Sequence, residues 1–241
     1  MLFRSQITLD NYHANRLKAL IYKTSDRLSI AYAVHSADRV WTPSQYSADE
    51  TVRLFPNAAG KVRVLPNQVD GFTERAADLA ARQLPERYWL LVGTRELRKN
   101  VPFLVDAWLQ ARRQSPGVPE LVLVGSLDHL PEAQRCLPGV RALSGVSDAE
   151  LQALYRQASR LWQPSYAEGF GLPVIEALSV GTPVAVASGT SLDEITPPSA
   201  PRFSPTDAPA LVQLMVTLAE RPDEEPPEQR RQWAARFNQH A

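Results

Sequence analysis

The sequence predicts an α/β fold: a doubly wound, Rossmann-like parallel sheet preceded by a mostly helical N-terminal part. Residues 89–92, 121–124 and 183–186 are continuous apolar runs, as in parallel strands that are buried on both faces. Between the first two runs, residues 101–109 place apolar side chains at i, i+3, i+4, i+7 and i+8, the stripe of a helix that covers a sheet. Alternating strands and helices imply right-handed crossovers and ligands at the carboxyl ends of the strands.

The remaining helices are indicated by their starts and by their apolar spacing. Ser147 and Glu150 stand at the N-cap and N3 positions of a capping box, which predicts a helix that begins after Ser147. Residues 208–220 and 228–238 also have helical patterns.

The N-terminal part differs from the rest in pattern. Residues 1–54 are typical of helix and loop, a short apolar segment follows at 62–65, and a polar stretch then extends to about Pro85. We therefore predict an N-terminal part over residues 1–72, a linker over 73–87 and the sheet domain over 88–241.

Composition excludes several classes of function. Basic and acidic residues number 26 each, so no net field attracts nucleic acid. Cys136 is the one cysteine, which excludes an internal disulfide, and the four histidines lack metal-ligand spacing. We expect no metal requirement. Apolar runs are too short to span a bilayer and no signal peptide is recognisable, so a cytoplasmic protein is predicted.

The stretch EGFGLPVIE, residues 168–176, carries the strongest functional signal. Gly169 and Gly171 allow the backbone to approach a ligand closely, and Pro173 suits the first turn of a helix. The free amides at such a helix start attract phosphate. Glu168 and Glu176 can then border one pocket, one meeting a sugar and the other a ribose. The alternative is that both are solvated carboxylates around an ordinary loop.

The second signal is GTRELRKN, residues 93–100, which joins the end of a predicted strand to a helix. At this position Arg98 and Lys99 would project into the crevice at the carboxyl edge of the sheet. Fixed cations there would stabilise the negative charge that develops on a departing diphosphate. A solvated basic helix start is the alternative.

These motifs resemble family 4 retaining glycosyltransferases, which have the GT-B fold. Residues 168–176 match the family's E-x7-E motif, and residues 181–184 and 188–195 resemble the strand and loop that follow it. The resemblance implies that Glu168 contacts hydroxyls of the donor sugar and that Glu176 holds the nucleotide ribose. It assigns the distal phosphate to the amides of Phe170, Gly171 and Leu172.

The same resemblance assigns roles to the other candidates. Arg98 and Lys99 would bind the donor diphosphate, with Thr94 beside them in the same motif, and Leu97 replaces a frequent proline. Gly125 would line the crevice, and the backbone of Val146 would contact the base, although both positions are equally consistent with ordinary turns. The catalytic candidates are thus Arg98, Lys99 and Glu168, and the donor-binding candidates are Thr94, Gly125, Val146, Phe170, Gly171, Leu172 and Glu176.

The resemblance covers residues 37–241 and leaves the acceptor half incomplete. Residues 37–44 and 61–70 resemble segments that close the family's N-terminal domain, with Gln68 in place of the usual glycine. We therefore expect 1–72 to be the remnant of an acceptor domain. Holding donor and acceptor together can supply ~7 to 11 kcal/mol of barrier reduction.

Three functions follow as hypotheses. The first is retaining transfer of a hexose, mannose being a guess, from a GDP- or UDP-sugar to a polysaccharide or lipid-linked acceptor. The second is a nucleotide-sugar-binding module that is inactive or depends on a partner chain for the acceptor domain. The third, a sugar-nucleotide epimerase, does not predict the EGFGLP turn. Basic residues in the N-terminal segment indicate either a peripheral contact with the inner face of a membrane or, more simply, a solvated helix face; they are Arg4, Arg16, Lys18, Lys23 and Arg27.

Overall fold

A computed structural model describes residues 16–69, 72, 77–128, 130–221 and 225–238 of the chain. The sheet domain contains six parallel strands in the order β5-β4-β3-β6-β7-β8. Their bounds are β3 Tyr88–Val92, β4 Glu120–Val124, β5 Val140–Leu143, β6 Arg160–Gln163, β7 Val184–Ala187 and β8 Arg202–Phe203. The doubly wound α/β prediction is confirmed, and each of the three predicted strands lies within one residue of its observed bounds.

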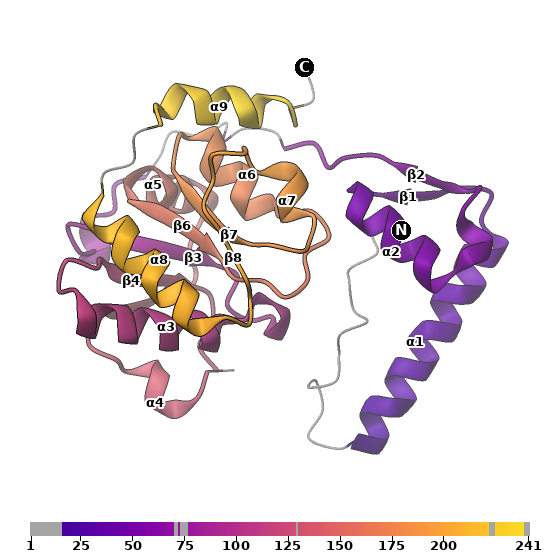
Figure 1. The fold of residues 1–241 in the computed structure, drawn as a ribbon, viewed down its shortest axis with the longest axis horizontal. Helices are drawn as coiled ribbons and strands as arrows, with labels where there is room; N and C mark the ends of the chain where they lie inside the picture. The colour runs from indigo at the N-terminus through magenta and orange to yellow at the C-terminus, as the bar shows by residue number, and fades with distance from the viewer. Residues whose placement is uncertain (1–15, 70–71, 73–76, 129, 222–224, 239–241) are drawn as a thin grey trace.

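Helices cover both faces of this sheet (Figure 1). The helices of this domain are α3 Val101–Gln114, α4 Glu132–Arg135, α5 Asp148–Gln157, α6 Leu172–Ser179, α7 Leu192–Ile195, α8 Ala208–Glu220 and α9 Pro227–Ala235, of which α9 packs on α6. Successive side chains of a strand point to opposite faces. In β3, Trp89 and Leu91 therefore pack with α3 and α8, whereas Tyr88 and Leu90 pack with α5 and α6.

The predicted capping box at the start of α5 is confirmed. Ser147 Oγ accepts a hydrogen bond from the Glu150 amide at 3.3 Å, and the Glu150 carboxylate accepts one from the Ser147 amide at 2.9 Å. This start places α5 on the face of the sheet that also carries α6.

The N-terminal elements form a smaller unit beside the sheet domain (Figure 1). It contains α1 Arg16–Ser36, β1 Val40–Thr42, α2 Gln45–Leu54, the short helix η2 Pro56–Ala58 and β2 Val62–Val64. β1 and β2 pair in parallel, with Val40 opposite Val62. The predicted helical character is confirmed, and the apolar segment at 62–65 becomes a strand.

The segment between the two units contains one short helix, η3 Ala80–Arg82. Leu79, just before it, is buried in the core of the sheet domain. Because residues 70, 71 and 73–76 lie outside the described residues, the division at 72 and 87 stays a prediction. Arg4 and the side chains of Arg16, Lys18 and Lys23, on which the membrane hypothesis rests, also lie outside them.

No helix in the part of the chain that the structure describes has the length and the hydrophobicity that crossing a membrane requires.

Candidate functional site

The order of the strands identifies one edge of the sheet as the place for a ligand. The chain runs from β3 outward through β4 to β5, then returns to the other side of β3 and runs outward again through β6, β7 and β8. The carboxyl ends of β3 and β6 therefore flank the point where the direction reverses, and a doubly wound sheet opens a crevice there. Arg98 and Lys99 follow β3, and Glu168 follows β6.

A tight turn after β3 presents the two cations. The short helix η4, Leu97–Lys99, ends at Asn100, which has a left-handed backbone with φ of 54°. Asparagine tolerates this conformation better than most residues, and its side chain donates to the Pro205 carbonyl at 3.0 Å. The Lys99 side chain is consequently buried, whereas Arg98 keeps partial contact with solvent.

Glu168 is the counter-ion of both cations. Its Oε2 atom lies 2.9 Å from Lys99 Nζ, and its Oε1 atom lies 2.6 Å from an Arg98 guanidinium nitrogen. Gln163 and Ser165 also donate to Oε2, at 3.0 and 3.2 Å. Burial on its own raises the pKa of Glu168, but the charges of Lys99 and Arg98 outweigh burial and the net pKa is lowered. Glu168 is thus held ionised.

Glu176 has the opposite environment. It lies on α6, and burial raises the pKa of its carboxyl. The Tyr155 hydroxyl donates to Glu176 Oε2 at 2.8 Å, which lowers the pKa but does not offset the burial. Burial also raises the pKa of Tyr155, so this phenol keeps its proton. The two carboxyls of the motif therefore have pKa values that are shifted in opposite directions.

Between these carboxylates, the turn that leads into α6 leaves four backbone amides free. Among the described residues, no group accepts a hydrogen bond from the amides of Gly169, Phe170, Gly171 or Leu172. Gly171 has φ of 108°, and a Cβ atom there would lie 2.7 Å from Leu192 Cδ2, so both the conformation and the space require glycine. Free amides at a helix start can bind an anion.

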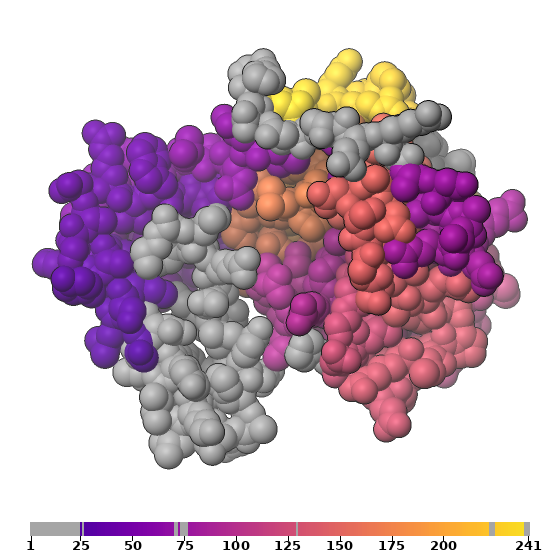
Figure 2. Space-filling model, turned by 180° about the vertical axis from the view of Figure 1, so that it is seen from behind, coloured from indigo at the N-terminus to yellow at the C-terminus, as the bar shows by residue number. Residues whose placement is uncertain are grey.

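A cavity of about 430 Å³ brings these groups together. Seven of the ten predicted site residues line it: Arg98, Lys99, Glu168, Phe170, Gly171, Leu172 and Glu176. Figure 2 shows the molecule from behind. The cavity lies where the residues near α6, coloured orange, are set back between the indigo N-terminal unit and the magenta residues that follow β3.

The other three candidates do not line this cavity. The Thr94 hydroxyl donates to the Ser126 carbonyl at 2.6 Å, and a Cβ atom on Gly125 would lie 2.5 Å from the Thr94 hydroxyl oxygen. These two residues hold the ends of β3 and β4 together. Val146 is partly buried against the core in front of α5.

Sequence reasoning missed several residues of the cavity. Glu96 lines it and accepts a hydrogen bond from Arg98 at 2.7 Å, and Pro43 and Asn67 line it from the N-terminal unit. Pro43 and Asn67 lie in the two segments that resemble the family, which was the available signal, but the pattern does not show that these segments reach the donor motif.

Among the described residues, no group of three or more His, Cys, Asp or Glu side chains is arranged to hold a metal ion.

Residues 86–221 match the protein family described as "Glycosyl transferases group 1". The chain belongs to the group 1 glycosyltransferases. Among curated relatives of this glycosyltransferase is the Escherichia coli O-antigen chain mannosyltransferase B, at 30% identity, with 79% of this chain and 55% of the relative covered. The chain thus spans about half the length of that relative.

Solved structures show the same fold. Sucrose-phosphate synthase from Thermosynechococcus elongatus matches 98% of this glycosyltransferase with a TM-score of 0.74 and 22% identity. Anabaena HepE, in complex with UDP and glucose, matches 89% with a TM-score of 0.75 and 19% identity. In each case 63% of the solved chain is covered. The likenesses confirm the predicted GT-B fold.

Proposed function

We propose that this chain binds a nucleotide sugar in the cavity between β3 and β6 and transfers its hexose, with retention of configuration, to a glycan or lipid-linked acceptor. The observation that carries the proposal is the convergence of two cations, four free amides and two carboxyls on one cavity. A diphosphate and a sugar need these chemical groups within reach of each other.

The diphosphate occupies the positive side of the cavity in this proposal. The amides at the start of α6 receive the distal phosphate, and Arg98 and Lys99 contact the bridging region. Breaking the bond between the sugar and the diphosphate moves negative charge onto the leaving phosphate. Cations and amides that are already in place stabilise this charge without reorganisation. The arrangement needs no metal ion, so we expect a chelator to leave the affinity unchanged.

The two carboxyls hold the sugar and the ribose. A carboxylate has about four acceptor positions. These positions are divided between the two oxygens, about two on each. Oε2 is crowded by three donors, whereas Oε1 accepts from Arg98 alone and keeps one position for a sugar hydroxyl. Glu176 lines the same cavity from α6 and is assigned to the ribose.

Donor and acceptor classes rest on the relatives. The E. coli relative is an O-antigen chain mannosyltransferase, which supports GDP-mannose as the first donor to test and a polysaccharide precursor as the acceptor. HepE was solved with UDP and glucose, so UDP-glucose is the second donor to test. Retention follows from the resemblance to family 4 enzymes and is decided by the anomeric proton signal of the product.

A second candidate function is donor binding without independent transfer. The described residues before β3 build a small unit with a two-stranded sheet, and transfer requires an acceptor held against the donor. In this case a partner chain supplies the acceptor site. Binding of the donor without hydrolysis or transfer by the pure chain, together with a partner recovered from the native host, would favour this alternative.

Calorimetry with GDP, GDP-mannose, UDP, UDP-glucose and ADP-glucose tests the proposal. One nucleotide series should bind, and Lys99→Ala should weaken it by about tenfold to a hundredfold, because a charge-assisted hydrogen bond contributes ~1.5 to 3 kcal/mol. Lys61→Ala is the matched control: this lysine, remote from the cavity lining, bonds to backbone carbonyls of the N-terminal unit. The proposal fails if every nucleotide leaves the wild-type chain unbound.

A further inference from the structure

The N-terminal end of α2 contacts the turn that carries the free amides. The hydroxyls of Ser44 and Ser47 both donate to the Gly169 carbonyl, at 2.9 and 3.1 Å. These contacts join positions that are more than 120 residues apart in the chain. The described N-terminal unit thus reaches the anion-binding turn directly, at the carbonyl whose peptide plane carries the free Phe170 N–H group.

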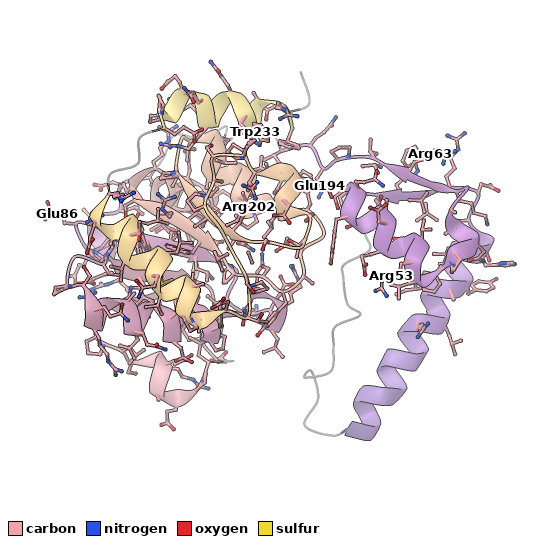
Figure 3. The ribbon with its side chains drawn as sticks, viewed as in Figure 1. Arg53, Arg63, Glu86, Glu194, Arg202 and Trp233 are labelled. Carbon is pink, nitrogen blue, oxygen red and sulfur yellow. The ribbon has the colours of Figure 1, made fainter. Side chains whose placement is uncertain are left out.

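A carboxylate of the sheet domain holds α2 in this place. Glu194 accepts hydrogen bonds from the backbone amides of Gln45 and Tyr46, at 2.9 and 2.5 Å. These are free donors of the first turn of α2, where a negative charge is favoured. Figure 3 shows Glu194 between α7 and the end of α2.

All three carbonyls of the turn are engaged by hydroxyls. Ser44 and Ser47 occupy the Gly169 carbonyl, while Ser191 donates to the carbonyls of Glu168 and Phe170, at 2.7 and 3.1 Å. In a trans peptide the N–H group points away from the preceding carbonyl. Holding these carbonyls therefore fixes the directions of the amides of Gly169, Phe170 and Gly171.

Without such contacts, the peptide between Gly169 and Phe170 could rotate. Glycine has no Cβ atom and accepts a wide range of backbone angles at little steric cost. A rotated peptide would direct a carbonyl oxygen, instead of an N–H group, toward the phosphate. The carbonyl would repel the anion that the amide attracts.

We propose that Ser44 and Ser47 are positioning residues for donor binding: they hold the Gly169 carbonyl so that the Phe170 amide faces the diphosphate, and Glu194 keeps α2 in place to do so. This inference rests on the proposed function of the cavity. It makes the described N-terminal unit part of the donor site, in addition to any role toward an acceptor.

The double variant Ser44→Ala/Ser47→Ala removes both donors. Ser44 is also the N-cap of α2, because its Oγ accepts a hydrogen bond from the Ser47 amide. The control is therefore Thr51→Val/Asp207→Ala, which removes one buried hydroxyl of α2 and the N-cap of α8 at positions away from the turn. We expect affinity for the preferred nucleoside diphosphate to fall about tenfold in the test variant and to stay unchanged in the control. Urea unfolding should give similar losses of stability for both variants.

A second readout needs no nucleotide. Hydrogen bonds to a carbonyl polarise the peptide, so the amide signal of Phe170 should move in the ligand-free test variant and stay in place in the control. Labelling with 15N-phenylalanine is practical because the chain has seven phenylalanines, and Phe170→Leu assigns the signal. Ser44→Ala/Ser47→Thr, which restores one donor, should recover part of the shift and of the affinity.

Equal affinities in the test and control variants, or an unmoved Phe170 signal, would overturn the inference. A wild-type chain that binds no nucleoside diphosphate would instead overturn the proposed function, and the Phe170 signal would still decide whether the hydroxyls orient the turn. Glu194→Gln should shift the same signal, whereas Glu50→Gln, an exposed carboxylate of α2, should not.

Discussion

Replacing Glu168 by glutamine tests the buried ion pair on which the site is built. Glu168→Gln keeps the size of the side chain but removes its charge. Lys99 is then left without its carboxylate while its side chain is only 5% exposed, whereas Arg98 retains Glu96. Removing one partner of a buried ion pair costs ~3 to 5 kcal/mol. We expect a loss of about 3 kcal/mol in the free energy of unfolding at pH 7, because Gln163 and Ser165 can still donate to the new carbonyl.

A double-mutant cycle measures the coupling free energy between Glu168 and Lys99. It compares urea unfolding of the wild type, Glu168→Gln, Lys99→Met and the double variant. The double variant leaves neither charge unpaired, so it should be more stable than the sum of the single losses by about 2 kcal/mol. The control is the exposed pair of Glu50 and Arg53, whose side chains are 38% and 64% exposed, and its coupling should stay below ~1 kcal/mol. Additive losses within ~0.5 kcal/mol at Glu168 and Lys99 would refute the reasoning.

Three further predictions concern the same domain. Folding raises the pKa of Glu176, so the free energy of unfolding should fall as the pH rises from the ordinary carboxyl pKa through the raised pKa of the folded state. Urea unfolding at pH 4 to 7 should show this fall in the wild type and not in Glu176→Gln. Gly171→Ala should cost ~1 to 3 kcal/mol of stability and abolish nucleotide binding, because its Cβ would meet Leu192. The control Gly60→Ala, where nothing lies within 4 Å of the new Cβ, should leave binding intact. Ser147→Ala should lose ~1 kcal/mol of stability in thermal unfolding through loss of the capping box.

One strand that sequence reasoning missed, β6, has polar residues at buried positions. β6 contains Arg160 and Gln163, both buried, and lacks the continuous apolar run that identified β3. The Arg160 guanidinium donates to the Val184 carbonyl, 24 residues further along the chain, and the Gln163 amide donates to Glu168, which lies beyond the end of the strand. The apolar pattern within the strand does not show that Arg160 has a partner on β7.

The candidate site was predicted in composition but not in its internal contacts. The spacing of Glu168 and Glu176 and the cations at 98 and 99 indicated one cavity, and the structure brings these four side chains to one. The sequence suggested separate tasks for Glu168 and Lys99. Their direct pairing depends on β3 and β6 being neighbours, which follows from the strand order.

The sequence by itself determined the alternation of strands and helices, the helix start at Ser147 and the glycine-rich turn at residues 168–172. Each of these depends on residues within about one helical turn of each other, so a local pattern contains the necessary information. Only the tertiary structure decided that Ser44 and Ser47 of the N-terminal unit contact Gly169, and that Glu194 caps α2. Such contacts arise from the packing of whole elements, and their geometry is not encoded in spacing along the chain.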